Sequence, residues 1–269
     1  MPVMAAFLFA SLTALLVAAA VTTAANLATT VYLHRCLSHR ALVLRAPLRF
    51  AFRVLTWVTT GIRPRQWMAV HRKHHAFTDV DGDPHSPVLL GWRTVQLHNV
   101  GLYRRALRDP ELVRRYARDL PADSWDRLLF DHALVGLGAG VTLLVVVFGW
   151  VIGLLAAGIH TVMYLQGNAA VNALGHHFGR RPYENSATNL QWLALLTMGE
   201  GLHNNHHAAP TSAKLAFHAG ELDPAWPLVR LLAGLRLVEF RHPGGVFRPP
   251  AARRAHPGLP VASQAIDRG

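Results

Sequence analysis

Two segments of the sequence place three histidines at the same helical spacing. Residues 71–75 read HRKHH and residues 203–207 read HNNHH, so in each segment the histidines stand at positions i, i+3 and i+4. Residues three and four apart lie on one side of a helix, and each segment can therefore direct three imidazoles at a metal ion. A third segment, HRCLSHR at residues 34–40, adds two more histidines. Because these imidazoles exceed the needs of one ion, the sequence predicts two metal ions.

The residue types leave the kind of metal open. Structural zinc sites prefer four ligands with cysteine prominent, and catalytic zinc sites use three protein ligands, whereas imidazole also suits iron, copper and nickel. Cys36 is the single cysteine, and we expect it to be a small buried residue rather than a ligand. His34 and His39 would lie about 140° apart on a regular helix. They can face one metal only if the helix ends or unwinds between them.

The composition is that of a membrane protein. Of the 269 residues, 51% are hydrophobic and the mean hydropathy is +0.21, which exceeds the usual value for a soluble domain. The net charge of +12 comes mainly from arginines in polar segments between apolar runs. Anionic lipid head groups and the excess of basic residues in cytoplasmic loops account for such a pattern. We therefore expect membrane lipids, and no nucleic acid, as partners.

Three apolar runs are candidates for membrane spans. Residues 4–30 carry no charge and are long enough to cross a hydrocarbon core about 30 Å thick. Residues 128–149 and 151–170 form two more runs, with a turn near Gly149. No Lys or Arg precedes Arg35, which disfavours a cleaved signal peptide. The arginines after the first run place that end in the cytoplasm, so three crossings bring all the clustered histidines to the cytoplasmic side.

Shorter segments are expected at the membrane surface. Residues 47–61 are too short and too charged to span the bilayer, so they lie in the interface or re-enter. Residues 226–238 predict an interfacial helix, and residues 104–119 predict either an amphipathic surface helix or a solvated charged face. The acidic stretch 79–85 lacks the spacing of a calcium loop. We expect it to end the preceding helix and to orient the neighbouring histidines.

These elements predict an all-α, multi-pass membrane protein with about three transmembrane helices, interfacial helices and a cytoplasmic histidine-rich cap that holds two metals. The amino terminus is then outside. One membrane domain covers residues 1–240, and the segment 241–269, rich in Pro, Arg and Gly, is expected to be a flexible tail.

Together, the histidine segments resemble those of the integral-membrane fatty acyl desaturases of the stearoyl-CoA desaturase type, bacterial members included. The matching motifs are HRxxSHR at residues 34–40, HRxHH at residues 71–75 and GEGxHNxHH at residues 199–207. Asn172 and His176 add an Asn-x-x-x-His motif ahead of GRRPY at residues 179–183. The resemblance covers roughly residues 10–240. That family usually has four spans in two hairpins, and we expect this chain to lack the first span.

The resemblance implies two sets of iron ligands. The first iron is held by His34, His39, His71, His75 and His206. The second is held by His74, His176, His203 and His207, with Asn172 reaching it through a water. The remaining histidines are expected to be surface, supporting or satisfied core groups, and they include His85, His98, His132, His160 and His177. No catalytic residue beyond the metal ligands is expected.

The activity that the resemblance implies is insertion of a double bond into a fatty acyl chain. Removing hydrogen from an unactivated methylene needs an oxidant stronger than any side chain, and the resemblance implies that this oxidant is a diiron centre that reduces O2 with two electrons supplied from outside. Zinc can replace iron in an overexpressed sample. The sequence has neither a nucleotide-binding fingerprint nor a ferredoxin-type cysteine motif. We therefore expect a separate electron donor, such as a ferredoxin, a cytochrome b5 or a flavoprotein.

Two other functions stay open. A related diiron hydroxylase acting on a lipid or hydrocarbon would have similar histidine segments, although GEGxHN and the Asn172 motif favour desaturation; product analysis separates the two. A metal transporter or sensor would need ionisable groups within its spans, for which His160 is the main candidate. Iron-dependent consumption of O2 would exclude it.

The residues directly before the middle histidine segment depart from the family. Animal acyl-CoA desaturases have an Arg-Asp pair there that helps to bind CoA, whereas this chain has Ala69 and Val70. Neither side chain can pair with a phosphate, although Arg63, Arg65 and Arg72 are close in sequence. We therefore favour an acyl chain linked to a membrane lipid or another non-CoA carrier, while acyl-CoA stays the alternative.

Overall fold

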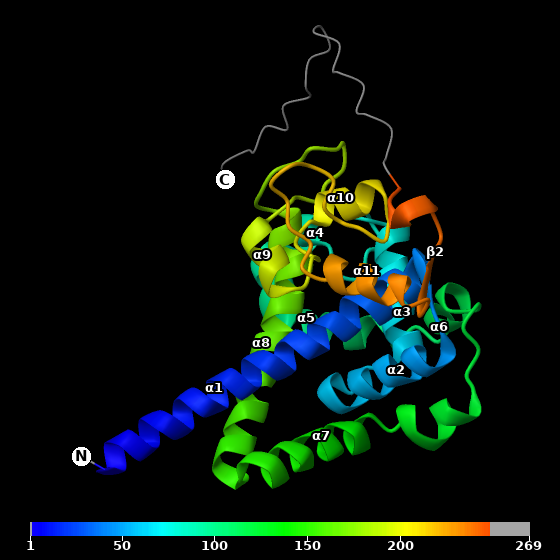
Figure 1. Ribbon diagram of the computed structural model, residues 1–269. Coiled ribbons are helices and arrows are strands. Elements are labelled where there is room, and N and C mark those ends of the chain that lie inside the picture. Colours follow the sequence, from blue (N-terminus) through cyan, green and yellow to red (C-terminus); the bar gives the residue numbers. More distant parts are fainter. Residues whose placement is uncertain (1, 248–269) are drawn as a thin grey trace, which may run out of the picture.

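The computed structural model describes residues 2–247, which fold into a set of helices with one pair of short strands (Figure 1). The α-helices are α1 Pro2–Ala28, α2 Ala46–Thr60, α3 Pro64–Ala76, α4 Pro87–Leu90, α5 Trp92–Ala106, α6 Glu111–Tyr116, α7 Ala133–Phe148, α8 Trp150–Ala173, α9 Gln191–Leu196, α10 His203–Ala208 and α11 Trp226–Gly234. The π-helices are η1 Thr29–Ser38 and η2 Asp126–Phe130, the 3-10 helices are η3 Leu174–His176 and η4 Pro243–Gly245, and the strands are β1 Leu42–Leu44 and β2 Val238–Phe240.

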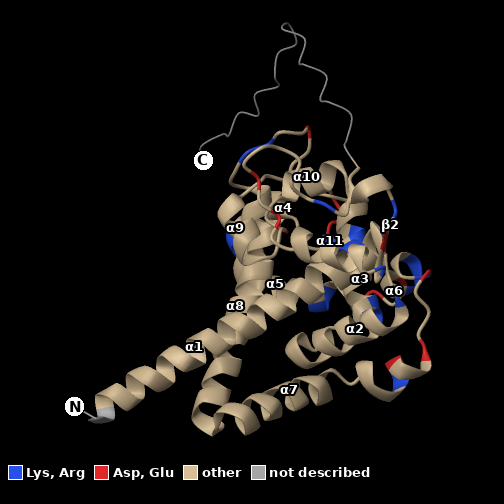
Figure 2. Ribbon diagram, in the orientation of Figure 1, with Lys and Arg blue, Asp and Glu red and all other residues tan. Residues whose placement is uncertain are grey.

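Two helices among the described residues are long and apolar enough to cross a membrane. One runs through α1 and η1 over Met4–Ser38, and the other runs through α8 and η3 over Trp150–His176. Helix α7 has 16 residues, or about 24 Å at 1.5 Å per residue, which is shorter than the roughly 30 Å hydrocarbon core. Figure 2 shows no Lys, Arg, Asp or Glu on α1, α7 or α8, whereas charged residues gather around the opposite part of the molecule. The third crossing stays a prediction.

Small residues let the long helices approach closely. Ala14 and Ala18 of α1 pack against Ala156 of α8, and all three are fully buried. A Cβ added at Gly153 of α8 would lie 2.7 Å from the backbone of α7, so only glycine permits this contact. The expected turn near Gly149 is confirmed, since Gly149 links α7 to α8 with a φ of +80°. Close approach of small residues is the usual way in which helices associate in a membrane.

The prediction of a purely α-helical fold is wrong in one detail. Strands β1 and β2 pair antiparallel, with Leu42 opposite Phe240 and Leu44 opposite Val238. The predicted helix over 226–238 therefore stops earlier, because α11 ends at Gly234 and the chain then turns into β2. A strand of three residues is too short to show an alternating pattern. Its pairing joins the segment after the first histidines to the end of the described chain.

Two further boundaries differ from the expected ones. Residues 104–119 do not form one helix, because α5 ends at Ala106 and α6 begins only after Pro110. The apolar run expected from residue 128 begins instead with the π-helix η2, and α7 starts at Ala133. In each case a short polar stretch interrupts the apolar pattern.

The predicted tail lies mostly outside the described residues. Residues 248–269 are not described, but the segment before them packs against the rest of the chain. The carbonyl of Gly245 accepts hydrogen bonds from the backbone N–H groups of Ala213 and Lys214 (2.9 and 3.1 Å). The part of the chain that packs against the helices therefore extends at least through η4. It passes residue 240, where we expected the flexible tail to begin.

Candidate metal centre

The first histidine segment lies on the π-helix η1. In a π-helix the hydrogen bonds join residues five apart rather than four, and the His39 N–H accordingly donates to the His34 carbonyl (3.1 Å). This wider turn places His34 and His39 one above the other, which a regular helix cannot do. Of the two expected alternatives, a helix end or an unwinding between the two residues, the structure shows the second, because the helix continues as a π-helix to Ser38.

Helix α3 supplies imidazoles in two directions. His71 and His75, one turn apart, lie with His34, whereas His74 lies with His176. Trp67 stacks on the His71 ring, with centroids 4.9 Å apart and planes 10° apart. The indole thereby limits the rotation of that imidazole.

The third histidine segment forms α10 and is divided in the same way. His206 lies with His34, and His203 and His207 lie with His176 at the end of η3. Gly201 precedes this helix at a place where an added Cβ would be 2.3 Å from the Ala194 nitrogen. The glycine therefore allows the chain to enter α10 closely packed against α9.

The nine histidines thus form two clusters. The five-histidine cluster consists of His34, His39, His71, His75 and His206, and the four-histidine cluster consists of His74, His176, His203 and His207. Within each cluster, one nitrogen per ring lies within 4.8 Å of the others. Two nitrogens on opposite sides of an ion would be about 4.2 Å apart at a bond length of about 2.1 Å. Each cluster is therefore close to the size of one coordination sphere.

In the five-histidine cluster the Nε2 atoms converge. The Nε2 atoms of His39 and His71 are 2.7 Å apart, and His206 Nε2 lies 3.0 Å from that of His34 and 2.9 Å from that of His75. Such short spacings bring together the lone pairs that a metal ion requires.

Glu200 supports this cluster from behind. Its Oε1 accepts from His34 Nδ1 (2.8 Å) and from the Thr30 hydroxyl. With Nδ1 donating, the Nε2 lone pair of His34 is directed into the cluster, an arrangement common to metal-bound histidines. Burial works to raise the pKa of Glu200, but His34 and Arg35 hold it below its usual value. The carboxylate therefore stays charged.

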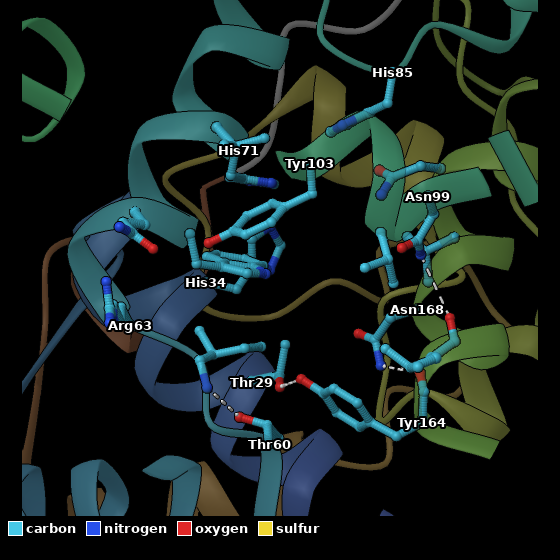
Figure 3. Close-up of a pocket in the computed structure, with 18 of the residues that line it drawn as sticks. Thr29, His34, Thr60, Arg63, His71, His85, Asn99, Tyr103, Tyr164 and Asn168 are labelled. Carbon is cyan, nitrogen blue, oxygen red and sulfur yellow. Dashed lines mark hydrogen bonds between the residues drawn. The ribbon is translucent and has the colours of Figure 1, made fainter. Parts of the chain in front are cut away.

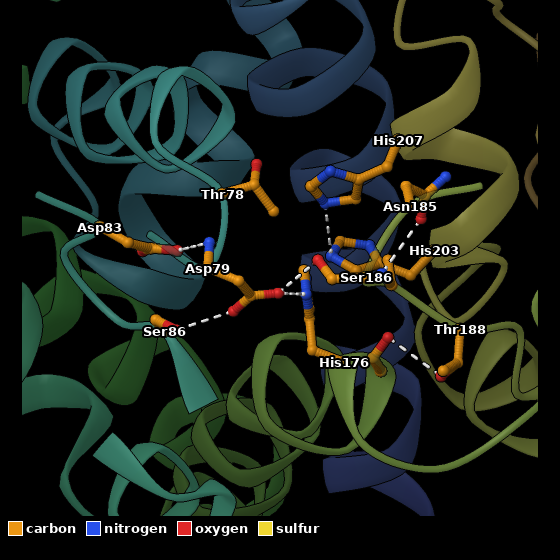
Figure 4. Close-up of polar contacts among 12 residues, drawn as sticks. Thr78, Asp79, Asp83, Ser86, His176, Asn185, Ser186, Thr188, His203 and His207 are labelled. Carbon is orange, nitrogen blue, oxygen red and sulfur yellow. Dashed lines mark hydrogen bonds and ion pairs between the residues drawn. The ribbon is translucent and has the colours of Figure 1, made fainter. Parts of the chain in front are cut away.

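The four-histidine cluster is supported by two carboxylates from the loop after α3. Asp83 Oδ2 accepts from His74 Nδ1 (2.9 Å), and Asp79 Oδ2 accepts from His176 Nδ1 (2.7 Å). Figure 4 shows Asp79 held in turn by the hydroxyls of Ser86 and Ser186. The prediction that this acidic stretch orients neighbouring histidines is confirmed.

The remaining ring nitrogens fit a metal ion. With their Nδ1 atoms donating, His74 and His176 turn Nε2 atoms inward that are buried and have no hydrogen-bond partner. A buried polar atom without a partner costs about 1–3 kcal/mol, and coordination would remove this cost. Burial, together with the charge of neighbouring rings, holds the pKa of several cluster histidines well below the usual value, namely His39, His71, His75, His203, His206 and His207. These imidazoles are neutral, as metal ligands must be.

Two cavities reach the clusters through different histidines. The first, of about 520 Å³, is lined by His34, His71 and His203 and extends to Thr60 and Tyr164 (Figure 3). The second, of about 740 Å³, is more open and is bordered by polar groups and by three cluster histidines, His39, His75 and His207. The first cavity has the size of a small-molecule site.

The other histidines among residues 2–247 do not join the two clusters. His177 is exposed and lies against Trp92, as expected, although His176 beside it is buried in the four-histidine cluster. His98 and His132 are exposed. His85 stacks on His74 with centroids 4.7 Å apart and lines the first cavity.

Sequence reasoning placed all nine clustered histidines in their groups but missed two supporting residues. Asn172, expected near the second metal, lines the first cavity together with His203. Glu200 and Trp67 were not singled out, although Glu200 stands within the GEGxHN motif, three residues before His203. An acidic residue at that spacing was the available signal.

Comparison with known proteins agrees with this geometry. The model of the fatty acid desaturase family matches residues 10–244, a range that includes every clustered histidine. The chain belongs to the fatty acid desaturase family.

Individual relatives match most of this chain. A protein of Arabidopsis thaliana named Delta-9 desaturase-like 2 is 33% identical over 79% of this chain and 71% of its own length. An sn-1 stearoyl-lipid 9-desaturase of Synechocystis is 28% identical over 77% of this chain and 64% of its own length. An icosanoyl-CoA 5-desaturase of Limnanthes douglasii is 30% identical over 78% of this chain and 59% of its own length. The relatives thus include enzymes named for lipid-linked and for CoA-linked chains, and this chain spans about three fifths to seven tenths of their lengths.

Proposed function

We propose that this protein inserts a double bond into a fatty acyl chain with O2, using two iron ions held by the two histidine clusters. A –CH2–CH2– pair, O2, two electrons and two protons give –CH=CH– and two waters. The observation that carries the proposal is that two clusters of mostly buried imidazoles border one cavity of about 520 Å³, which is lined by His34, His71 and His203. The names of the relatives support the acyl substrate.

The protein's own residues hold, orient and shield the site. When bound, the irons supply an oxidising power that no side chain has. Imidazole also binds zinc, so zinc can occupy the clusters in an overexpressed sample. The carboxylates of Asp79, Asp83 and Glu200 keep three imidazoles in the tautomer whose Nε2 is free to bind a metal. Burial of the clusters keeps bulk water from the reacting methylenes.

Electrons then enter from a separate carrier through the second cavity. Of the clustered histidines, His39, His75 and His207 are the partly exposed ones, and all three line that cavity. The substrate and the electron donor would thus reach the clusters from different cavities. A ferredoxin, a cytochrome b5 and a flavoprotein all remain suitable donors.

The carrier of the acyl chain is proposed to be a membrane lipid or another non-CoA group. Ala69 and Val70 are buried with Leu112 and Ala117. Val70 also lines the first cavity, where its apolar side chain cannot pair with a phosphate. Arg72 cannot substitute for the missing contacts, because both of its terminal nitrogens bond to Asp119.

Arg63 is the remaining one of the three arginines near this segment. It is exposed and lines the first cavity, and its side chain has no hydrogen bond or ion pair among the described residues. Arg65, by contrast, donates to the Leu120 carbonyl (2.8 Å). Arg104 lines the same cavity, and two arginines suit the single phosphate of a lipid head group better than the several anionic groups of CoA.

The decisive experiment supplies the iron-loaded protein with O2, a reductant and either labelled phospholipid or labelled acyl-CoA. Mass spectrometry should find a product lighter by two hydrogens from the phospholipid, and none from the inactive His206→Ala variant. A product heavier by one oxygen would identify a hydroxylase instead. Rapid desaturation of acyl-CoA with none of phospholipid would overturn the proposed carrier while keeping the activity.

We also propose that α1, α7 and α8 all cross the membrane, with both clusters on the cytoplasmic side. The apolar faces of the three helices and the arginines that follow α1 support this topology. Tags at the two termini should report opposite sides of the membrane in intact cells. Tags on the same side would contradict three crossings and leave the two long helices as the spans.

A further inference from the structure

One histidine outside the two clusters reaches the first cavity. His85 lines this cavity together with three cluster histidines, His34, His71 and His203 (Figure 3). The Nε2 atom of His85 is buried and has no hydrogen-bond partner among the described residues. A buried polar atom without a partner destabilises the folded protein unless a bound molecule supplies the missing bond. His85 is therefore a candidate for binding a molecule in the cavity.

The chain holds His85 in place both by its backbone and by its ring. The backbone N–H of His85 donates to Asp83 Oδ1 (2.9 Å), and the other oxygen of this carboxylate accepts from His74 Nδ1 (2.9 Å). The His85 ring stacks on the His74 ring, with centroids 4.7 Å apart and planes 29° apart. Directly after His85, the Ser86 hydroxyl accepts from the Leu89 N–H (3.2 Å) at the start of α4. One carboxylate thus helps to position both histidines.

His85 is not one of the four grouped imidazoles that surround the second metal position. It does lie close to His74 and Asp83, but these two residues are already bonded to each other through His74 Nδ1 and Asp83 Oδ2. A nitrogen that carries a proton has no lone pair to offer to a further ion. The Nε2 atom of His85 is therefore left for a ligand in the cavity rather than for a metal of its own.

We propose that His85 Nε2 donates a hydrogen bond to the oxygen atoms that the reaction reduces to water. The inference rests on the proposed desaturase function, in which O2 meets the acyl chain in the cavity that His85 lines. A neutral imidazole can carry its proton on Nε2, and a fixed donor stabilises negative charge that develops on a nearby oxygen. His85 would bind the oxygen atoms directly, while the nine clustered histidines hold the irons.

Azide tests this role without turnover, because it is an anion that binds to open positions on metal ions and accepts hydrogen bonds. The iron-loaded, oxidised, full-length protein is titrated with azide, and the dissociation constant is read from the absorbance. His85→Phe keeps an aromatic ring against His74 but removes the N–H group. His85→Gln keeps an N–H group but removes the ring. His98→Phe is the matched control, since His98 is exposed and outside both clusters.

His85→Phe should weaken azide binding about tenfold or more, which is the effect of losing a hydrogen bond to a charged group. His85→Gln should lose less affinity, and His98→Phe should keep the wild-type value. All three variants should keep the metal content of the wild-type protein. During turnover, His85→Phe should also release more hydrogen peroxide per double bond, because the partly reduced oxygen is held less firmly.

Equal azide affinity in the wild-type protein and His85→Phe would overturn the role of His85. So would the reverse order, with His85→Gln weaker than His85→Phe, because it would show that stacking on His74 is what matters. Loss of a metal from both His85 variants would likewise make His85 a support of the cluster. Absence of unsaturated product from the wild-type protein would instead overturn the proposed function, and the role of His85 toward O2 with it.

Discussion

The two histidine clusters share helices α3 and α10 but are held in place by different means. In the four-histidine cluster, two of the four imidazoles are fixed by carboxylates, Asp79 and Asp83, that come from one loop. In the five-histidine cluster only one of the five imidazoles, His34, has a carboxylate partner. The four-histidine cluster is therefore positioned mainly by loop carboxylates, and the five-histidine cluster mainly by the packing of helices.

The loop that supports the four-histidine cluster is itself strongly constrained. Asp79 has a φ of +59°, a left-handed conformation that costs a non-glycine residue about 1–3 kcal/mol. Its two oxygens accept from three side chains, those of His176, Ser86 and Ser186. These bonds hold the residue in the strained conformation, so the carboxylate is aimed before any metal binds.

A buried ion pair adds to the helix packing around the five-histidine cluster. Arg35, next to His34, pairs with Asp223 (2.9 Å), and both side chains are almost completely buried. Its other terminal nitrogen donates to the Ala213 carbonyl (2.7 Å). Gly199 passes so close that an added Cβ would lie 2.5 Å from Asp223 Oδ1. These contacts join η1 to the segments before and after α10, and thus position His34 relative to His206.

The largest expected effect comes from removing one ligand of each cluster. His206→Ala should remove the metal of the five-histidine cluster, and His203→Ala that of the four-histidine cluster, because each leaves an incomplete coordination sphere. Metal content should fall from about two ions to about one per chain, and desaturation should fall to background in both variants. Elemental analysis and product analysis measure the two effects.

His98→Ala is the matched control, since His98 is exposed and outside both clusters. It should keep both metals. Loss of both metals from either single variant would break the distinction between the clusters, because it would show that they form one cooperative site. Full turnover in His203→Ala and His206→Ala would contradict the assignment of these histidines as ligands.

The sequence allowed the long elements and the ligand groups to be predicted, for identifiable reasons. The charge-free stretch of α1 and the apolar stretch of α8 are long enough to stand out from any globular helix. The spacing of the histidines pointed to two metals, but their division into groups of five and four rested on the resemblance to desaturases. His176 is an example. No helical spacing in the sequence links it to His74, so only the resemblance placed these two residues in one group.

The missed features depend on contacts between distant residues. The hydrogen-bonded Tyr164 and Thr29 are 135 positions apart, and His34 and Glu200 are 166 apart, so no local pattern records either pair. The need for unwinding between His34 and His39 followed from helical geometry, but the form of the unwinding depends on how η1 packs. The strands β1 and β2 were missed because three residues give no periodic signal.

A smaller and more discriminating effect is expected from the supporting carboxylates. Asp83→Asn and Asp79→Asn remove the charge that fixes His74 and His176, and loss of such a partner typically lowers metal affinity 10- to 100-fold. Glu200→Gln should lower the affinity of the five-histidine cluster by less, because four of its five imidazoles lack a carboxylate partner. Titration of the metal-free protein with Fe²⁺ or Zn²⁺ measures the affinity of both sites.

Asp81→Asn is the control, since Asp81 stands between the two supporting aspartates and is exposed. If Glu200→Gln weakens binding as much as Asp83→Asn does, the five-histidine cluster is held by its carboxylate rather than by helix packing, and the contrast between the clusters is wrong.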